Sequence, residues 1–127
     1  MTPVTLPNRK PAHNQGMTTP APYTYIANVD PAAVVPASGI LSRTLHNDDQ
    51  NKVVQFTFAP GAELSAHTAP FPASIYIVRG EGILQLGEDT HEVSPGAFAQ
   101  MTPKLEHAIR ARTELVMLLI MNKGARA

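Results

Sequence analysis

The chain contains no cysteine and no excess of either charge, because ten lysines and arginines balance ten aspartates and glutamates. The absence of cysteine excludes disulfides, thiolate zinc sites and cysteine nucleophiles, so a metal would need histidine, carboxylate or amide ligands. Balanced charge without a basic or acidic block argues against nucleic acid or an anionic membrane as partners. Residues 1–10 lack the apolar run of a signal peptide or membrane span, and we therefore expect a cytoplasmic protein.

No long helical pattern is present either, and seven of the twelve prolines fall in the first 36 residues. Because proline fixes its own φ and donates no backbone hydrogen bond, residues 1–22 are interpreted as a loose, Pro-rich, disordered segment. Residues 23–29 are predicted to form a first strand, and residues 30–33 a short helical turn. The length of 127 residues fits one domain, which we place at residues 23–127.

From residue 39 onward the sequence consists of short β-rich runs separated by turn residues, the pattern of a sandwich or closed barrel. The predicted strands are residues 39–45, 52–58, 74–78, 82–86, 90–93, 97–101, 107–111 and 115–121. The last of these is apolar without interruption, so we expect both of its faces to be covered, one by the core and one by a second subunit. This pattern predicts a homodimer.

Two segments resemble the two sequence motifs of the cupins. Gly61, His67 and Gly80 match the first motif at its spacing, and Gly96 and His107 match the second. The resemblance covers about residues 61–111 and implies an all-β fold, the double-stranded β-helix or jelly-roll barrel.

The departures from these motifs bear on chemistry. The resemblance implies a metal held by three imidazoles and one carboxylate, but Ala69 stands at the place of the second His and Ala73 at the place of the Glu. Only His67 and His107 remain as metal ligands, and the second motif's proline, glycine and asparagine are replaced by Thr102, Lys104 and Ala111. Losing one residue that hydrogen-bonds to a metal ligand lowers the affinity for the metal by about 10- to 100-fold. Losing two of the ligands themselves should therefore lower it on the order of ten-thousand-fold. A divalent metal (Fe, Mn, Zn or Ni) is expected to bind weakly or not at all.

The sequence does not select a third ligand. His46 and His91 lie at turns and are expected to face solvent, and His13 belongs to the N-terminal segment. Arg79, at a strand end, is interpreted as a surface charge. The oxygen and amide donors that remain open on barrel strands are Glu63, Gln55 and Gln100.

With two alanines in place of a large polar pair, the mouth of the barrel should be roomy and apolar. Strand alternation predicts a pocket lined by Ala69, Phe71, Ala73, Ile75, Ile77 and Ile109. Such a pocket suits a small apolar molecule whose polar end contacts the two imidazoles. The first hypothesis is therefore a small-molecule-binding cupin-like barrel with an incomplete His-based metal site. The alternatives are a metal-dependent cupin enzyme (oxygenase, isomerase or lyase) that uses His67 and His107, and a structural dimeric barrel.

Overall fold

The computed structural model describes residues 22–30 and 34–124. Within these ranges the chain forms nine strands and no helix. The strands are β1 (Ile40–Asn47), β2 (Asn51–Phe58), β3 (Glu63–His67), β4 (Ala73–Arg79), β5 (Gly82–Leu86), β6 (Asp89–Val93), β7 (Phe98–Met101), β8 (His107–Ala111) and β9 (Leu115–Asn122).

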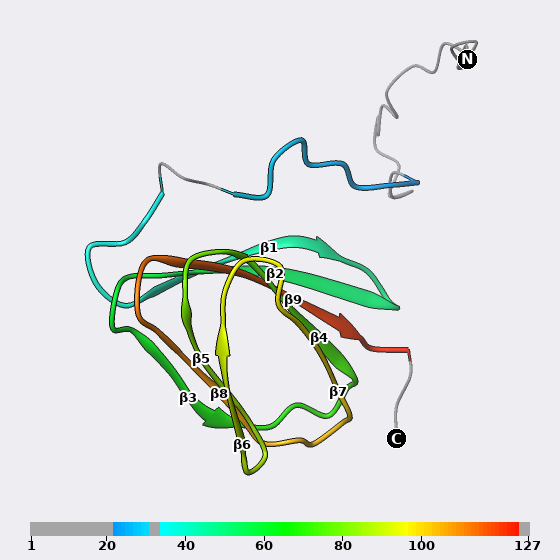
Figure 1. The fold of residues 1–127 in the computed structure, drawn as a ribbon. Helices are drawn as coiled ribbons and strands as arrows, with labels where there is room; N and C mark the ends of the chain where they lie inside the picture. Colours follow the sequence, from blue (N-terminus) through cyan, green and yellow to red (C-terminus); the bar gives the residue numbers. More distant parts are fainter. Residues whose placement is uncertain (1–21, 31–33, 125–127) are drawn as a thin grey trace, which may run out of the picture.

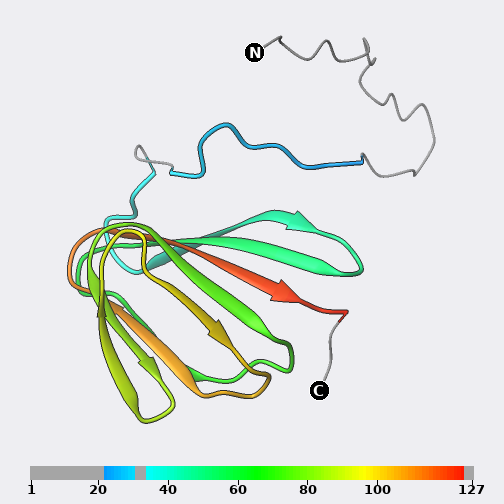
Figure 2. The ribbon, with the colours of Figure 1, turned by 45° about the vertical axis from the view of Figure 1, so that its right-hand side comes forward.

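The strands form two antiparallel sheets that face each other (Figures 1 and 2). One sheet has the strand order β1-β2-β9-β4-β7, and the other has the order β3-β8-β5-β6. Every pair of hydrogen-bonded neighbours is antiparallel, as in a jelly-roll barrel. The predicted all-β fold is confirmed.

The core lies between the two sheets and follows the period-2 alternation of the strands. Ile75 and Ile77 point inward from β4, with 1% and 0% of their surface exposed. Ile109 and Leu84, which are register partners on β8 and β5, face them from the other sheet and are also buried. The rest of the buried apolar cluster comprises Phe58, Ala73, Val93, Met101, Ala111, Leu115 and Met117.

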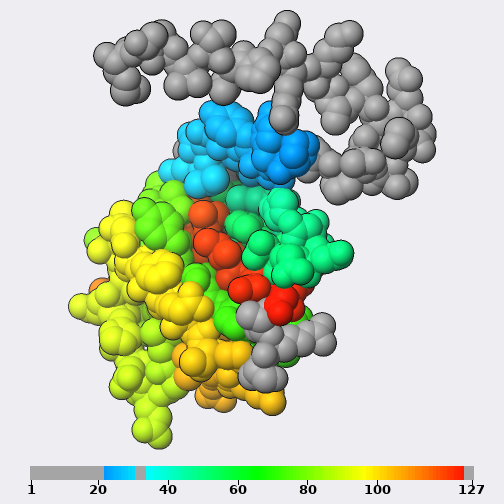
Figure 3. Space-filling model, turned by 90° about the vertical axis from the view of Figure 1, so that its right-hand side faces the viewer, coloured from blue at the N-terminus to red at the C-terminus, as the bar shows by residue number. Residues whose placement is uncertain are grey.

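The outer face of the five-stranded sheet keeps apolar side chains in contact with solvent. Figure 3 looks onto this face, where β9 in red runs between the blue-green of β1 and β2 and the green and yellow of β4 and β7. Tyr76 of β4, Ile120 of β9 and Leu41 of β1 lie on this face and are 39%, 36% and 46% exposed. Residues 22–30, in blue, lie across one end of the same face.

The set of strands differs from the sequence prediction in two places, and most of the other strands begin or end within one or two residues of the predicted bounds. The first strand predicted at residues 23–29 is wrong, because this segment pairs with no strand and its two tyrosines are largely exposed. β3 was not predicted, because of its five residues only Leu64 is a large apolar side chain. The helical turn predicted at 30–33 and the disordered segment predicted at 1–22 lie almost wholly outside the described residues.

No helix in the described ranges has the length and apolarity to cross a membrane.

Candidate functional site

The first and second motifs each contribute one histidine to a pair. His67 ends β3, His107 begins β8, and the two are direct register partners across these antiparallel strands. Their ring centroids are 4.2 Å apart, with the ring planes inclined at 57°. His107 is 6% exposed and His67 is half-buried. The strand pairing therefore holds the two imidazoles in contact at the edge of the core.

Backbone carbonyls fix the tautomer of both rings. Nδ1 of His67 lies 2.8 Å from the carbonyl oxygen of Ser65, and Nδ1 of His107 lies 2.9 Å from that of Leu105. Because a carbonyl oxygen only accepts, each Nδ1 must donate, and in the neutral ring each Nε2 carries the lone pair. In the described part of the chain, the only fully buried side-chain nitrogen or oxygen atoms that lack a hydrogen-bond partner belong to Gln55 and Arg79. The Nε2 atoms of His67 and His107 are not among them. Both Nε2 acceptors are therefore within reach of solvent or a ligand.

The donor set does not fit a resident metal. In residues 22–30 and 34–124 there is no group of three or more His, Asp, Glu or Cys side chains that could hold an ion. Two imidazoles are one protein ligand short of a catalytic zinc site and two short of a structural one. A metal at this pair would have to take its other ligands from water or from a bound molecule.

A cavity of about 300 Å³ lies between the sheets, with a mainly apolar lining that includes neither His67 nor His107. Its lining includes Ile75 and Ile77 of β4 and Leu84 and Leu86 of β5. Leu86 is the register partner of His107, so the cavity and the pair are adjacent along the inner face of the four-stranded sheet. The remaining lining residues are His91, Glu92, Val93, Ala97, Phe98 and Ala99.

Comparison with known proteins identifies the family. The family model described as the cupin domain matches residues 54–121, more than half of the chain. The chain belongs to the cupin superfamily. A search among curated proteins gives no significant match.

Solved structures, two of which are named as cupins, share the fold at low sequence identity. A conserved protein of unknown function from Streptococcus pyogenes is 23% identical, with a TM-score of 0.71 over 84% of this chain and 93% of its own. A cupin superfamily protein from Desulfitobacterium hafniense is 22% identical, with a TM-score of 0.65 over 72% and 86%. An RmlC-like cupin from Shewanella frigidimarina is 18% identical, with a TM-score of 0.65 over 68% and 78%. These likenesses establish the fold of this cupin and leave its activity open.

The residues predicted to line the pocket divide into three groups. Ile75 and Ile77 line the cavity, whereas Ala73 and Ile109 pack in the core at 2% exposure. Ala69 and Phe71 lie in the loop between β3 and β4 and are half-buried. The Ala69 carbonyl oxygen accepts a hydrogen bond of 2.7 Å from the Lys104 backbone amide.

None of the open donor candidates joins the histidine pair. Gln55 is 2% exposed on β2, where its register partners Arg43 and Leu118 belong to the five-stranded sheet. Gln100 accepts a hydrogen bond of 2.5 Å from the Ser74 hydroxyl on the same sheet. Glu63 is the register partner of Arg110 and lies on the solvent side of the four-stranded sheet. His91 is exposed as predicted, but it is the register partner of Leu84 and borders the cavity, which alternation along β6 could have revealed.

Two polar networks hold residues 22–30 to the barrel, and sequence reasoning missed both. Arg79, predicted as a surface charge, is part-buried. Its Nε donates to both Asp30 carboxylate oxygens, at 2.9 and 3.0 Å. Its Nη1 donates to the Glu114 carboxylate at 3.3 Å. Arg79 and Asp30 are 29% and 27% exposed, and they lie 49 residues apart in the sequence, where no local pattern connects them.

The second network is at the β1–β2 hairpin. His46 Nε2 donates to the Asp48 carboxylate at 2.6 Å, and its Nδ1 accepts from the Thr24 hydroxyl at 2.7 Å. The hydrogen bond from His46, followed by those from the backbone amides of Asn51 and Gln50, lowers the pKa of Asp48 to about 2. The carboxylate therefore remains ionised across the physiological range.

Proposed function

We propose that this cupin binds a small, mainly apolar molecule that presents a hydrogen-bond donor to the histidine pair. The observation that carries the proposal is the common tautomer of His67 and His107, whose Nδ1 atoms are both engaged by backbone carbonyls. Two neighbouring Nε2 lone pairs can accept from a hydroxyl, a carboxylic acid or an amide of a ligand. The adjacent cavity of about 300 Å³ matches the lower end of small-ligand pockets and offers an apolar wall.

Thermal-shift titration of the full chain with small aromatic and aliphatic carboxylic acids, phenols and alcohols tests this function. A hydrogen bond between neutral groups contributes about 0.5–1.5 kcal/mol, so His67→Phe and His107→Phe should each weaken binding by roughly two- to twelvefold. His46→Phe makes the same chemical change on the far hairpin and should leave the ligand-induced shift unchanged. If no compound of the panel raises the melting temperature, the chain is better described as a structural barrel.

The alternative is a metal-dependent enzyme that uses the same two imidazoles. Ligating histidines also donate Nδ1–H to a backbone carbonyl, so the observed tautomer suits a metal as well as a hydrogen-bond donor. The missing ligands would then come from water or from the substrate. Elemental analysis of untagged protein distinguishes the two functions, because our proposal expects well under one metal per chain. One full equivalent that disappears in His67→Phe would establish the metal alternative instead.

We also propose that two copies of the chain pair through the outer face of the five-stranded sheet. The support is the group of exposed apolar side chains on one face, including Tyr76, Ile120 and Leu41. Light scattering should give a dimer at micromolar concentration, and Ile120→Lys should convert it to a monomer, because a buried unpaired ammonium is costly. A wild-type monomer at that concentration would contradict the proposal.

A further inference from the structure

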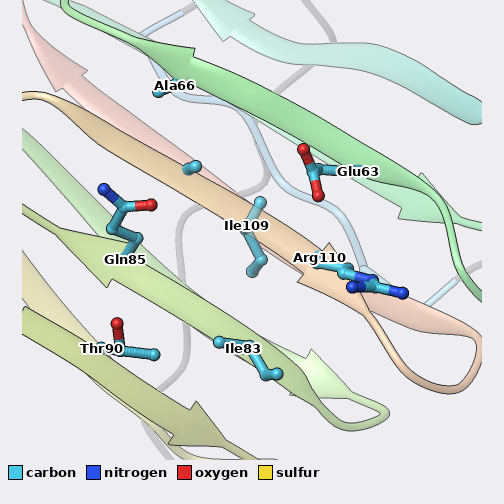
Figure 4. Close-up of a pocket in the computed structure, with 8 residues that line it drawn as sticks. Glu63, Ala66, Ile83, Gln85, Thr90, Ile109 and Arg110 are labelled. Atoms are coloured by element: carbon cyan, nitrogen blue, oxygen red, sulfur yellow. The ribbon is translucent and has the colours of Figure 1, made fainter.

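The outer face of the four-stranded sheet carries a hollow of about 250 Å³ that is separate from the histidine pair. Ala108 in the middle of β8 forms part of its floor, and the longer side chains of Ile83, Gln85 and Arg110 rise around it. Figure 4 shows Glu63 and Arg110 together at one end of the hollow, with Gln85 and Thr90 toward the other. The hollow exists because an alanine on a central strand is surrounded by longer side chains on its own and the neighbouring strands.

Two opposite charges border this hollow without an ion-pair partner. Glu63 and Arg110 are cross-strand register partners, yet no ion pair joins either side chain to another described residue. Glu92, in the same row of the sheet, behaves differently, because its carboxylate accepts from the Arg112 guanidinium at 2.6 Å. The available carboxylate and guanidinium therefore stand side by side, each able to bind a group of opposite charge.

The polar groups at the opposite end are also partly available. The Gln85 side-chain amide donates to the carbonyl oxygen of Gly87 at 3.1 Å, which leaves its own amide oxygen as an acceptor. The Thr90 hydroxyl, at the same end of the hollow, makes no hydrogen bond to another described residue. Between the two ends lie the apolar side chains of Ile83 and Ala108.

We propose that this hollow binds a small zwitterion of the α-amino-acid class. Its carboxylate would accept two hydrogen bonds from the planar guanidinium of Arg110, and its ammonium would donate to the Glu63 carboxylate. The apolar side chain of the ligand would then lie over Ala108 and Ile83. The hollow has room for a molecule of this size.

Charge balance selects a zwitterion over a simple ion. An anion near Arg110 would also approach Glu63, and a cation near Glu63 would approach Arg110, so either ion meets repulsion close to its attraction. A ligand with both charges a few ångströms apart satisfies both side chains and leaves the site neutral. Because the site is open to water, we expect affinity in the millimolar range.

The test is a nuclear magnetic resonance titration of the ¹⁵N-labelled full chain with L-leucine and two matched analogues. The analogue 4-methylpentanoate lacks the ammonium group, and 3-methylbutylamine lacks the carboxylate. L-Leucine should shift the amide signals of Ala108 and Ile83 and bind at least about fivefold more tightly than either analogue, the factor that an exposed ion pair of about 1 kcal/mol supplies.

Variants test whether Glu63 and Arg110 bind the ligand or only neutralise each other's charge. Glu63→Gln and Arg110→Gln should each weaken leucine binding about fivefold, whereas Glu92→Gln in the same row should not. Binding that is equal for leucine and the analogues, unchanged in both variants, or absent at millimolar concentrations would overturn the proposal. His67→Phe should leave leucine binding intact, so the outcome is independent of the function proposed for the histidine pair.

Discussion

Replacement of Gly80 by alanine should be among the most damaging single-methyl changes in this barrel. Gly80 has a φ of +90°, and a Cβ there would overlap the carbonyl oxygen of Glu114 and lie 2.7 Å from the Leu115 Cα. The left-handed backbone costs an L-residue about 1–2 kcal/mol. The overlap involves backbone at the start of β9, where Leu115 and Val116 are 0% exposed, so relief requires a shift of the core that costs about 1–3 kcal/mol more. We expect a total loss of about 2–5 kcal/mol.

Gly61→Ala is the matched control for this prediction. Gly61 also has a positive φ, +81°, but a Cβ at that position would meet nothing within 4 Å. Gly61→Ala should therefore lower the free energy of unfolding only through the unfavourable backbone conformation. The expected loss is about 1 kcal/mol, because alanine also has less conformational entropy than glycine in the unfolded chain. Urea unfolding followed by circular dichroism gives both values, and the difference between the variants isolates the overlap. A Gly80→Ala variant that loses no more stability than Gly61→Ala would refute the reasoning.

Three further predictions concern single side chains. Arg79→Gln should lower the free energy of unfolding by about 1–2 kcal/mol, because the Asp30 carboxylate loses its charged hydrogen-bond donor. The variant should also be cleaved faster within residues 22–30 in limited proteolysis. Equal cleavage rates of the variant and the wild type would contradict this. The pKa of Asp48 is lowered from 3.8 to about 2, so its stabilising contribution is complete above about pH 4 and disappears as the pH falls through 2. Asp48→Asn should remove that part of the acid dependence of urea unfolding, and an unchanged acid limb would argue against it. Lys104 has a φ of +69°, so Lys104→Gly should gain about 0.5–1 kcal/mol, whereas Lys104→Ala, which keeps a Cβ, should gain nothing.

The sequence predicted most of the barrel because strand alternation is a local signal. The run at residues 107–111 and the run at residues 82–86 agree with β8 and β5 at both ends. The motif resemblance singled out His67 and His107, and the register between β3 and β8 in the folded chain makes them direct partners. Alternation also placed Ile75 and Ile77 on the inner face of β4.

What the sequence did not predict depends on contacts between distant residues. Arg79 resembles any strand-end charge until the fold brings Asp30 to it, and a polar strand such as β3 has no pattern of its own apart from its partner. The hollow beside Glu63 and Arg110 depends on which strands are neighbours in the four-stranded sheet, and β8 lies between β3 and β5 only in the folded chain.

Two motif positions that depart from the cupin pattern, Ala69 and Lys104, are joined to each other through the main chain. The Lys104 amide donates to the Ala69 carbonyl at 2.7 Å, and Lys104 retains the left-handed backbone that glycine adopts readily. This contact needs neither an imidazole at position 69 nor a glycine at position 104. The scaffold that positions the site is therefore built from backbone hydrogen bonds and strand register, which do not depend on the metal ligands. For this reason His67 and His107 stay in contact although the described residues include no group of three potential metal ligands, and in the function we propose their Nε2 atoms accept from the ligand.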